Sequence, residues 1–471
     1  MWVPNSWWEG PGGSGLKEEP VGCQREMGDQ GGAAPTRTSA ILSRPWLTVF
    51  LPVNAALSGF TVILPILILF TYHADVVAVA LAQTLYNISL IPAAMLWGRI
   101  CDRMQRRRPL LALNYLSLTV IFALVATVHG LNELLLLYAA FGWIAPSGAA
   151  ASNLLIMERF ELHERPTAYA SFSEMNVIGG TVGILAGYVW VEHFSGNLPS
   201  FLYLAASLSA LSAVLLFVLV PERITRMERT TIARHRESLD SRLRTLYPFF
   251  LELPTWTYWR KAAHWMRTEA THDVPLILVA SFLFNFAANL FNTSYTPFLE
   301  FLGLGAGGIF LVNLANNAAQ TVALPFSASA SEGRKAETSV VSSSWLRASG
   351  YAGVLVFATL IPLGLLSAHT NHNDYLLVNV GFYALLGLAV AFYSTSSSLL
   401  LFRSLEGRSI GSYLGANSAL GGLAAVLGSG LSGVITSHFG FAFTFGLSVV
   451  AMVAAVPVWI LSAEAFRMKR L

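Results

Sequence analysis

The sequence predicts an all-α polytopic membrane protein with twelve transmembrane helices in two six-helix bundles. Of its 471 residues, 54% are hydrophobic and only 12% are charged, whereas a soluble globular chain carries about 25% charged residues. Long apolar runs recur along the chain, and basic residues are confined to alternate connections between them. A chain of this composition has to be solvated by lipid rather than by water.

Apolar runs bounded by charged or turn residues give twelve candidate spans, each long enough to cross a hydrocarbon layer about 30 Å thick. The expected spans are 46–70, 76–97, 109–128, 134–156, 167–190, 200–220, 274–296, 304–326, 345–367, 375–399, 410–435 and 440–462. An even number of spans places both ends of the chain on the same side of the membrane.

The segments outside the spans divide the chain into domains. Residues 1–45 are rich in Gly, Pro and small polar residues, so we expect a disordered cytoplasmic tail, with initiation at Met27 as an alternative. Residues 222–273 combine aromatic and basic side chains, as either an interfacial helix or a solvated loop would. The expected order is therefore tail 1–45, bundle 46–221, cytoplasmic central loop 222–273, bundle 274–463 and cytoplasmic C-terminus 464–471.

The distribution of basic residues predicts the orientation. The 29 Lys and Arg lie in the tail, in the connections after even-numbered spans, at the C-terminus, or near the start of the ninth span, as Arg347 does. The connections on the other face contain none. Because cytoplasmic loops carry the excess of Lys and Arg, we expect cytoplasmic termini in a plasma-membrane protein. The small net charge of +3 favours lipid head groups, not nucleic acid, as partners of the basic loops.

The connection after the second span is a basic loop, Gly98 to Arg108, that holds five Arg and the single acid Asp102. Its spacing resembles the loop between helices 2 and 3 of the major facilitator superfamily of secondary transporters. The resemblance implies a gating motif in which Asp102 meets the N-terminal end of the eleventh helix. Its members are Gly98, Asp102, Arg103, Arg106 and Arg107. The alternative is that the Arg residues only set the topology.

An internal repeat supports two similar halves. Glu164-Arg165 precedes Gly179-Gly180 in the fifth span, and Glu406-Gly407-Arg408 precedes Gly421-Gly422 in the eleventh. Small residues three or four positions apart allow close helix packing, and the same smooth faces suit helices that slide past one another. The glycines expected to pack helices are Gly179, Gly180, Gly183, Gly187, Gly421 and Gly422.

Polar side chains inside the spans are mostly amides. Those on the seventh and eighth spans recur at helical spacing and form stripes, which should face protein or water instead of lipid. They indicate either hydrogen bonds between helices or a cavity for a neutral, zwitterionic or amphiphilic solute. The expected cavity residues are Asn54, Gln83, Asn87, Asn285, Asn289, Asn292, Asn313, Asn317 and Gln320.

One acid, Glu174, lies clearly inside a span. An ionised carboxylate is costly there, so Glu174 is either a proton-coupling group or a carboxylate paired with a loop arginine. The sequence contains no phosphate-binding loop, no metal-ligand spacing and no hydrolase motif. We therefore expect no enzyme activity, no cofactor and no metal. The favoured function is a monomeric secondary transporter that moves a small molecule, coupled to protons, by alternating access; the alternative is a transporter-like receptor or a membrane-embedded enzyme.

The topology can be tested by cysteine accessibility. Single cysteines at His73 or Glu300 should react with an impermeant thiol reagent added outside intact cells, because these connections carry no basic residues. Cysteines at Gln105 or Arg408 should react only after the membrane is permeabilised. Reversal at either pair would contradict the twelve-span arrangement.

Overall fold

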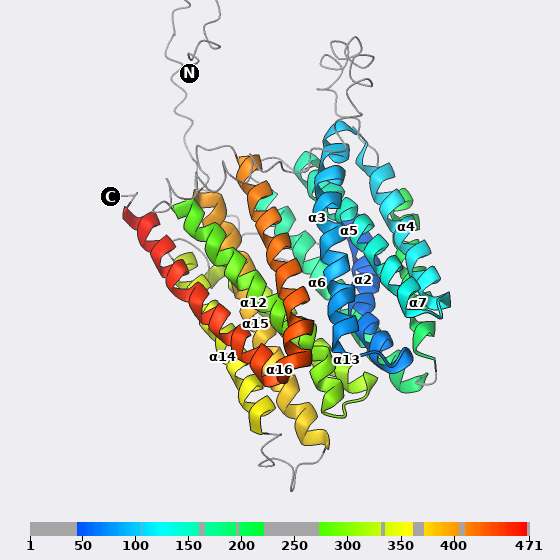
Figure 1. Ribbon diagram of the computed structural model, residues 1–471. Helices are drawn as coiled ribbons and strands as arrows, with labels where there is room; N and C mark the ends of the chain where they lie inside the picture. The colour runs from blue at the N-terminus through cyan, green and yellow to red at the C-terminus, as the bar shows by residue number, and fades with distance from the viewer. Residues whose placement is uncertain are drawn as a thin grey trace, which may run out of the picture. The chain divides into compact units, whose positions relative to one another are not determined.

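The computed structural model describes residues 45–104, 106–159, 165–194, 197–220, 273–330, 335–360, 372–404 and 410–468, and every regular element within these ranges is a helix (Figure 1). The expected tail, except Pro45, and nearly all of the expected central loop lie outside the described residues. The domain boundaries therefore stay predictions.

The first half of the described chain forms six helical segments. The first is a continuous run of η1 (Pro45–Val49), α2 (Phe50–Ile66) and η2 (Leu67–Thr71). The others are α3 (Val76–Arg103), α4 (Arg107–Thr127), α5 (Leu131–Arg159), α6 (Arg165–His193), and α7 (Phe201–Leu219) with its preceding turn η3 (Leu198–Ser200).

The second half forms six more. They are α12 (Asp273–Phe301), α13 (Ala306–Ala330), α14 (Lys335–Leu360), α15 (His372–Ser404) and the two parts of α16 (Ile410–Met468). The parts of α16 meet at Gly440, whose backbone angles of φ 82° and ψ 171° are not helical. A positive φ is accessible to glycine without steric cost, so the chain reverses there with almost no connecting loop.

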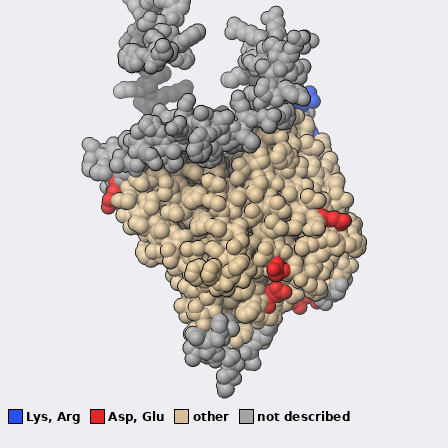
Figure 2. All heavy atoms as spheres, in the orientation of Figure 1, with Lys and Arg blue, Asp and Glu red and all other residues tan. Residues whose placement is uncertain are grey.

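Within the described ranges, nine helices are long and apolar enough to cross a membrane, with both parts of α16 included in one of them. The segments α13 and α14 are not among the nine, because amides and serines lower their hydropathy. Most of the visible surface of the helices carries no charged side chain (Figure 2). The fold is thus that of a polytopic membrane protein, as predicted.

The ninth segment begins ten residues earlier than predicted, at Lys335 instead of residue 345. The sequence from Lys335 to Ser344 is polar and reads as a loop. In the structure Ser343 and Ser344 are buried, and their hydroxyl groups donate to the carbonyl of Val340 in the same helix. Serines whose hydroxyl groups are hydrogen-bonded to their own helix in this way can lie in a helix within the membrane. Arg347 therefore lies in the middle of the described helix and not near its start.

The two halves repeat one packing pattern. In the first, α2 packs against α6 and α7, while α5 packs against α3 and α4, and α4 also contacts α7. In the second, α12 packs against α16, α13 against α15, and α14 against both α15 and α16. The repeated pairing agrees with the internal sequence repeat.

Two seams join the halves, α3 against α16 and α6 against α13. We call the end of the bundle that holds Pro45 and Met468 the terminal side, and the other end the opposite side. The first seam includes a hydrogen bond of 3.1 Å between Thr84 and Ser429. The second includes one of 2.9 Å between Thr181 and Thr321. Both seams thus include a contact between hydroxyl-bearing side chains.

Four glycines of α6 lie against neighbouring helices. A Cβ atom at Gly179 or Gly183 would overlap backbone carbonyl groups of α2, and one at Gly187 would overlap the ring of Phe310 on α13. A Cβ at Gly180 would lie 2.6 Å from Ser58 Oγ. On α16, a Cβ at Gly422 would lie 2.8 Å from Ile91, whereas one at Gly421 would meet nothing within 4 Å. The α6 glycines therefore let backbones approach closely.

A matched pair of glycine substitutions tests this packing. Gly183→Ala should lower the free energy of unfolding by about 1–3 kcal/mol, because the new methyl group overlaps the carbonyl of Ala55. Gly421→Ala should leave stability unchanged or raise it by up to about 1 kcal/mol through helix propensity. Thermal and denaturant unfolding in detergent measure both, and equal effects would contradict the packing argument.

Candidate functional site

The amides of α12 and α13 line one face of each helix but bond mainly to their own backbone. Asn285 and Asn289 donate to carbonyl groups four residues earlier, and Asn313 and Asn317 do the same. A carbonyl oxygen of each side chain thus stays available as an acceptor. The remaining two differ in environment, since Asn292 is exposed and Gln320 is half-buried.

The amides of α2 and α3 make contacts between helices. Asn54 donates to Asn176 of α6 at 2.8 Å, and Gln83 accepts from Tyr138 of α5 at 3.0 Å. Asn87 is buried and lies across the seam from Ser429 of α16, at 3.4 Å. The predicted amides therefore do not converge on one point, and the structure distributes them between helix contacts and open faces.

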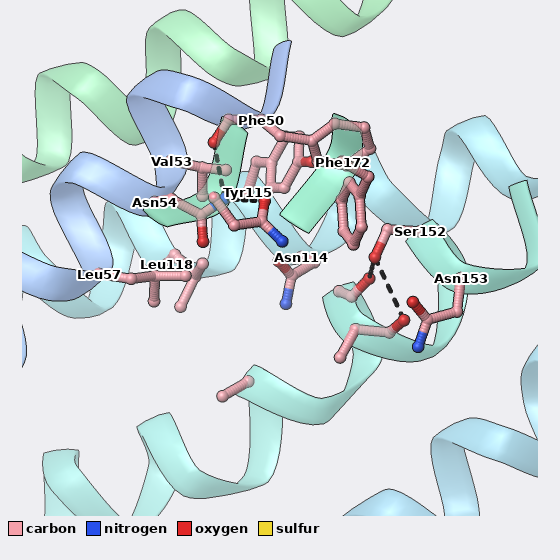
Figure 3. A pocket seen from close by; sticks show the side chains of 14 residues that line it. Phe50, Val53, Asn54, Leu57, Asn114, Tyr115, Leu118, Ser152, Asn153 and Phe172 are labelled. Carbon is pink, nitrogen blue, oxygen red and sulfur yellow. Dashed lines mark hydrogen bonds between the residues drawn. The ribbon is translucent and has the colours of Figure 1, made fainter. Parts of the chain in front are cut away.

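One cavity of about 300 Å³ lies inside the first half, between α2, α4, α5 and α6. Figure 3 shows Asn54, Asn114 and Asn153 arriving at it from three different helices. Its full lining is Phe50, Val53, Asn54, Leu57, Asn114, Tyr115, Leu118, Ala145, Gly148, Ala149, Ser152, Asn153, Phe172 and Asn176. None of these side chains is charged. The volume is at the lower limit of small-molecule pockets.

Of the predicted cavity residues, only Asn54 lines this cavity. Sequence reasoning missed Asn114, Asn153 and Asn176, because each is a single amide on its span and forms no stripe. A usable signal was their depth, since all three lie within about three turns of the terminal-side end of their helix. Amides at one depth on neighbouring helices can meet even when none has a polar neighbour along its own helix.

Arg347 is the second unexpected feature. It lies twelve residues into α14, is 6% exposed, and donates from Nε to the hydroxyl group of Tyr351 at 2.6 Å. Its guanidinium carbon lies 4.8 Å from the centre of the Phe284 ring, a distance typical of a cation–π contact. Phe284 itself stacks on Tyr393 of α15. A cation is thus held among aromatic rings in the middle of the second half.

Glu174 is half-buried on α6, two turns before Thr181 on the same helical face. Because Thr181 contacts α13, Glu174 lies on the face of α6 that follows the second seam toward the terminal side. Within the described part of the chain, its carboxylate makes no hydrogen bond or ion pair. Among the same residues, no group of three His, Cys, Asp or Glu could hold a metal ion.

The predicted gating loop is described only in part. Arg107 donates to the carbonyl groups of Cys101 and Met104, so it closes the turn between α3 and α4. Arg106 is exposed, and a Cβ atom at Gly98 would meet nothing within 4 Å. The side chains of Asp102 and Arg103 lie outside the described residues, as do those at the start of α16.

Carboxylates on the opposite side of the bundle contact the other half. The Glu192 carboxylate, at the end of α6, lies against Gly307 in the first turn of α13. Helix N-termini favour negative charge, so this contact joins the two halves by electrostatic attraction. His73 and Glu300, from the α2–α3 connection and α12, also interact electrostatically across the halves.

The sequence matches the family model described as Major Facilitator Superfamily over residues 46–382. No match is found among the curated proteins.

Several solved structures resemble the fold. A mutant of the nucleoside transporter NupG aligns with TM-score 0.60 and 12% identity, covering 89% of this chain and 99% of that one. A D-xylose-proton symporter aligns with TM-score 0.62 and 15% identity over 90% and 97% of the two chains. A POT family transporter in complex with 5-aminolevulinic acid gives TM-score 0.64 and 10% identity over 88% and 94%. At these identities the likeness concerns the fold alone.

Substitutions of Arg347 separate its charge from its volume. Arg347→Ala should lower the free energy of unfolding by about 2–4 kcal/mol, because it leaves a cavity and removes the donor to Tyr351. Arg347→Met refills most of the volume and removes a buried charge, so it should stay within about 1 kcal/mol of the wild type. Chemical denaturation measures both variants. If Met were as damaging as Ala, the charge itself would be required for stability.

Proposed function

Because the chain belongs to the major facilitator superfamily, and is therefore a secondary transporter and not an enzyme, we propose that it moves a small polar solute by alternating access with protons as the coupling ion. The two six-helix bundles would rock about the seams between them, and the solute would bind between changes of conformation. A receptor that only binds solute is the competing proposal.

The observation that carries alternating access is the composition of the two seams. Hydrogen bonds between single hydroxyl groups, such as Thr84 to Ser429 and Thr181 to Thr321, each contribute only about 0.6 kcal/mol within a membrane. Contacts this weak can break and reform during a cycle. Buried aromatic clusters that would resist such motion lie inside each half, for example Phe60 with Phe122 and Phe291 with Tyr351. A looser edge-to-face contact, Phe201 with Phe310 at 6.0 Å, crosses between the halves.

The contacts along the first seam support a conformer that is open on the terminal side. On the opposite side, Ala80 touches the position of Gly433, and near mid-depth Ile91 touches that of Gly422. Toward the terminal side, an added Cβ atom at Gly98 would meet nothing within 4 Å among the described residues. With cytoplasmic termini, as the distribution of Lys and Arg favours, this conformer would face the cytoplasm of a plasma-membrane transporter.

The gating loop would stabilise the conformer that is closed toward the cytoplasm. In a conformer closed toward the cytoplasm, Asp102 would meet the first turn of α16, where a helix favours an anion, and Arg103, Arg106 and Arg107 would hold the loop at the lipid surface. The contact between Glu192 and α13 supplies the same kind of interaction on the opposite side. Each half-cycle would then break one carboxylate-to-helix contact and form the other.

The coupling proposal rests on Glu174 and on a structural relative. One similar structure is named a D-xylose-proton symporter, and Glu174 is a described acid inside a span, without a described partner, on the α13-facing side of α6. Protonation would remove a charge that disfavours closure of α6 on α13 toward the terminal side. Solute movement would thereby depend on proton binding.

Reconstituted vesicles test both parts of the proposal. With D-xylose, uridine and 5-aminolevulinic acid as probes, the wild type should accumulate at least one of them when a pH gradient is imposed. Glu174→Gln should lose accumulation but keep exchange of solute at equal pH, because exchange needs no net proton movement.

The matched control is Glu133→Gln, which neutralises an exposed acid at the start of α5 and should leave accumulation unchanged. Binding of a probe without any movement would support the receptor alternative. Accumulation that persists in Glu174→Gln would exclude this residue as the coupling group.

A further inference from the structure

We propose that the solute carries a protonated primary amine, and that this group binds between the two halves against asparagine oxygens of α12 and α13. The inference rests on the proposed function, in which the solute binds where the two repeats meet, and it names the substrate class. It narrows the neutral, zwitterionic or amphiphilic solute that the amide stripes indicate to one whose recognised end is a cation with several N–H donors.

The site lies where the halves meet in the middle of the bundle. A Cβ atom at Gly180 of α6 would lie 2.6 Å from Ser58 Oγ of α2 and 3.7 Å from Asn317 Oδ1 of α13. All three residues lie within one turn of the midpoint of their helical segment. The oxygen is the atom of Asn317 nearest to Gly180. It therefore faces the first half, at the depth where such repeats bind solute.

The asparagines of α12 and α13 present more acceptors than donors. Four of them are half-buried and donate from Nδ2 to a backbone carbonyl four residues earlier, namely Asn285, Asn289, Asn313 and Asn317. An amide oxygen in the place of Nδ2 would repel that carbonyl, so the orientation is fixed. Each side chain thus keeps two oxygen lone pairs against one N–H donor. Two further amides bond to no described residue and can present either end, namely Asn292 and Gln320.

The asparagines of α12 lie on a different side of the helix from its packed rings. Phe284 and Phe291 stack on rings of α15 and α14, and Arg347 lies against the face of the Phe284 ring. At about 100° per residue, Asn285 and Asn289 point away from these contacts. Because α12 also contacts α2 and α3 of the first half, the asparagines of α12 and Asn317 of α13 border the space between the halves.

The charges of the surrounding helices favour a cation. The helices α2, α12 and α13 contain no Lys, Arg or His, and α6 has such residues only at its two ends. Away from the ends of these four helices, the single charged side chain is that of Glu174. An –NH₃⁺ group has three donors and no acceptor, so asparagine oxygens can replace part of its hydration shell, as carbonyl oxygens do for ions in channels. A carboxylate would find no counter-charge there.

Thiol labelling tests this selectivity without knowledge of the natural solute. Thr61→Cys places a thiol at an exposed position of α2, one turn from Ser58, in a Cys23→Ser background that retains the buried Cys101. The purified protein in nanodiscs at pH 7 is treated with 2-aminoethyl, 2-(trimethylammonio)ethyl or 2-sulfonatoethyl methanethiosulfonate. Each rate is divided by that of the same reagent with 2-mercaptoethanol, and the background without Thr61→Cys reports any reaction of Cys101.

The three reagents separate charge from hydrogen bonding. The aminoethyl reagent carries a positive charge and N–H donors, the trimethylammonio reagent carries the charge without the donors, and the sulfonate is an anion. The expected order of normalised rates is aminoethyl, then trimethylammonio, then sulfonate, with about tenfold between the first and the last.

Substitution of one asparagine tests whether its oxygen is responsible. Asn317→Leu should lower the ratio of aminoethyl to trimethylammonio labelling about five- to tenfold, as expected for one lost hydrogen bond. Asn317→Asp keeps an oxygen and adds a negative charge, so it should speed labelling by both cationic reagents. The matched control Asn132→Leu changes an exposed amide at the start of α5 and should leave the ratio unchanged. Thermal unfolding of each variant confirms that it is folded.

Protection of Thr61→Cys against N-ethylmaleimide tests small molecules directly. The methyl ester of 5-aminolevulinic acid, a cationic amine without a carboxylate, should slow labelling at a lower concentration than 5-aminolevulinic acid does. Methyl 4-oxopentanoate, which has the same skeleton without the amine, should give no protection.

Three results would overturn the inference. They are a ratio of aminoethyl to trimethylammonio labelling that Asn317→Leu leaves unchanged, labelling that is fastest with the sulfonate, and failure of every reagent to label Thr61→Cys. Accumulation of D-xylose or uridine in vesicles would in each case leave the transporter proposal standing. Conversely, amine-selective labelling and protection without movement of any probe across vesicles would support amine recognition and refute the proposed transport.

Discussion

The scarcity of water inside a bilayer is the constraint on which the rest of this structure depends. Each polar side chain that enters a span has to bond within the protein or face a cavity. Serines of α14 and amides of α12 and α13 meet this condition by bonding to their own helix. Polar groups without such a partner are therefore informative, and the Tyr115 hydroxyl group is one of them.

The same constraint gives two similar halves different interiors. Both use glycines to bring α6 or the first part of α16 against the opening helix of their half, as Gly183 does with Ala55 and Gly428 with Phe286. One half then leaves an uncharged recess, whereas the other encloses Arg347 among aromatic rings. A buried cation of this kind is stabilised by π faces and a tyrosine oxygen, so its surroundings are well packed.

The contacts inside each half are also stronger than the contacts at the seams between the halves. Within the halves, stacked aromatic rings and close backbone contacts bury large areas, which resist deformation. Between the halves, the described polar contacts include those of Thr84 and Asn87 with Ser429, of Thr181 with Thr321, and of Glu192 with the first turn of α13. Rigid bodies joined by weak, reversible contacts are what rocking requires, so the distribution of packing energy and the proposed cycle are consistent.

The sequence by itself determined the helical membrane fold and the internal repeat. The length of a hydrophobic run and the spacing of small residues are local properties, and the thickness of the bilayer sets the run length that a spanning helix needs. The sequence did not predict that α14 begins at Lys335, ten residues before the expected span, since the hydropathy of Ser343 and Ser344 does not reveal hydroxyl groups bonded to Val340. It also placed Arg347 near a helix end and passed over Asn114, Asn153 and Asn176. Only the tertiary structure decided these, because a cavity is formed by side chains from four helices, and which faces of those helices meet depends on packing between segments distant in the chain.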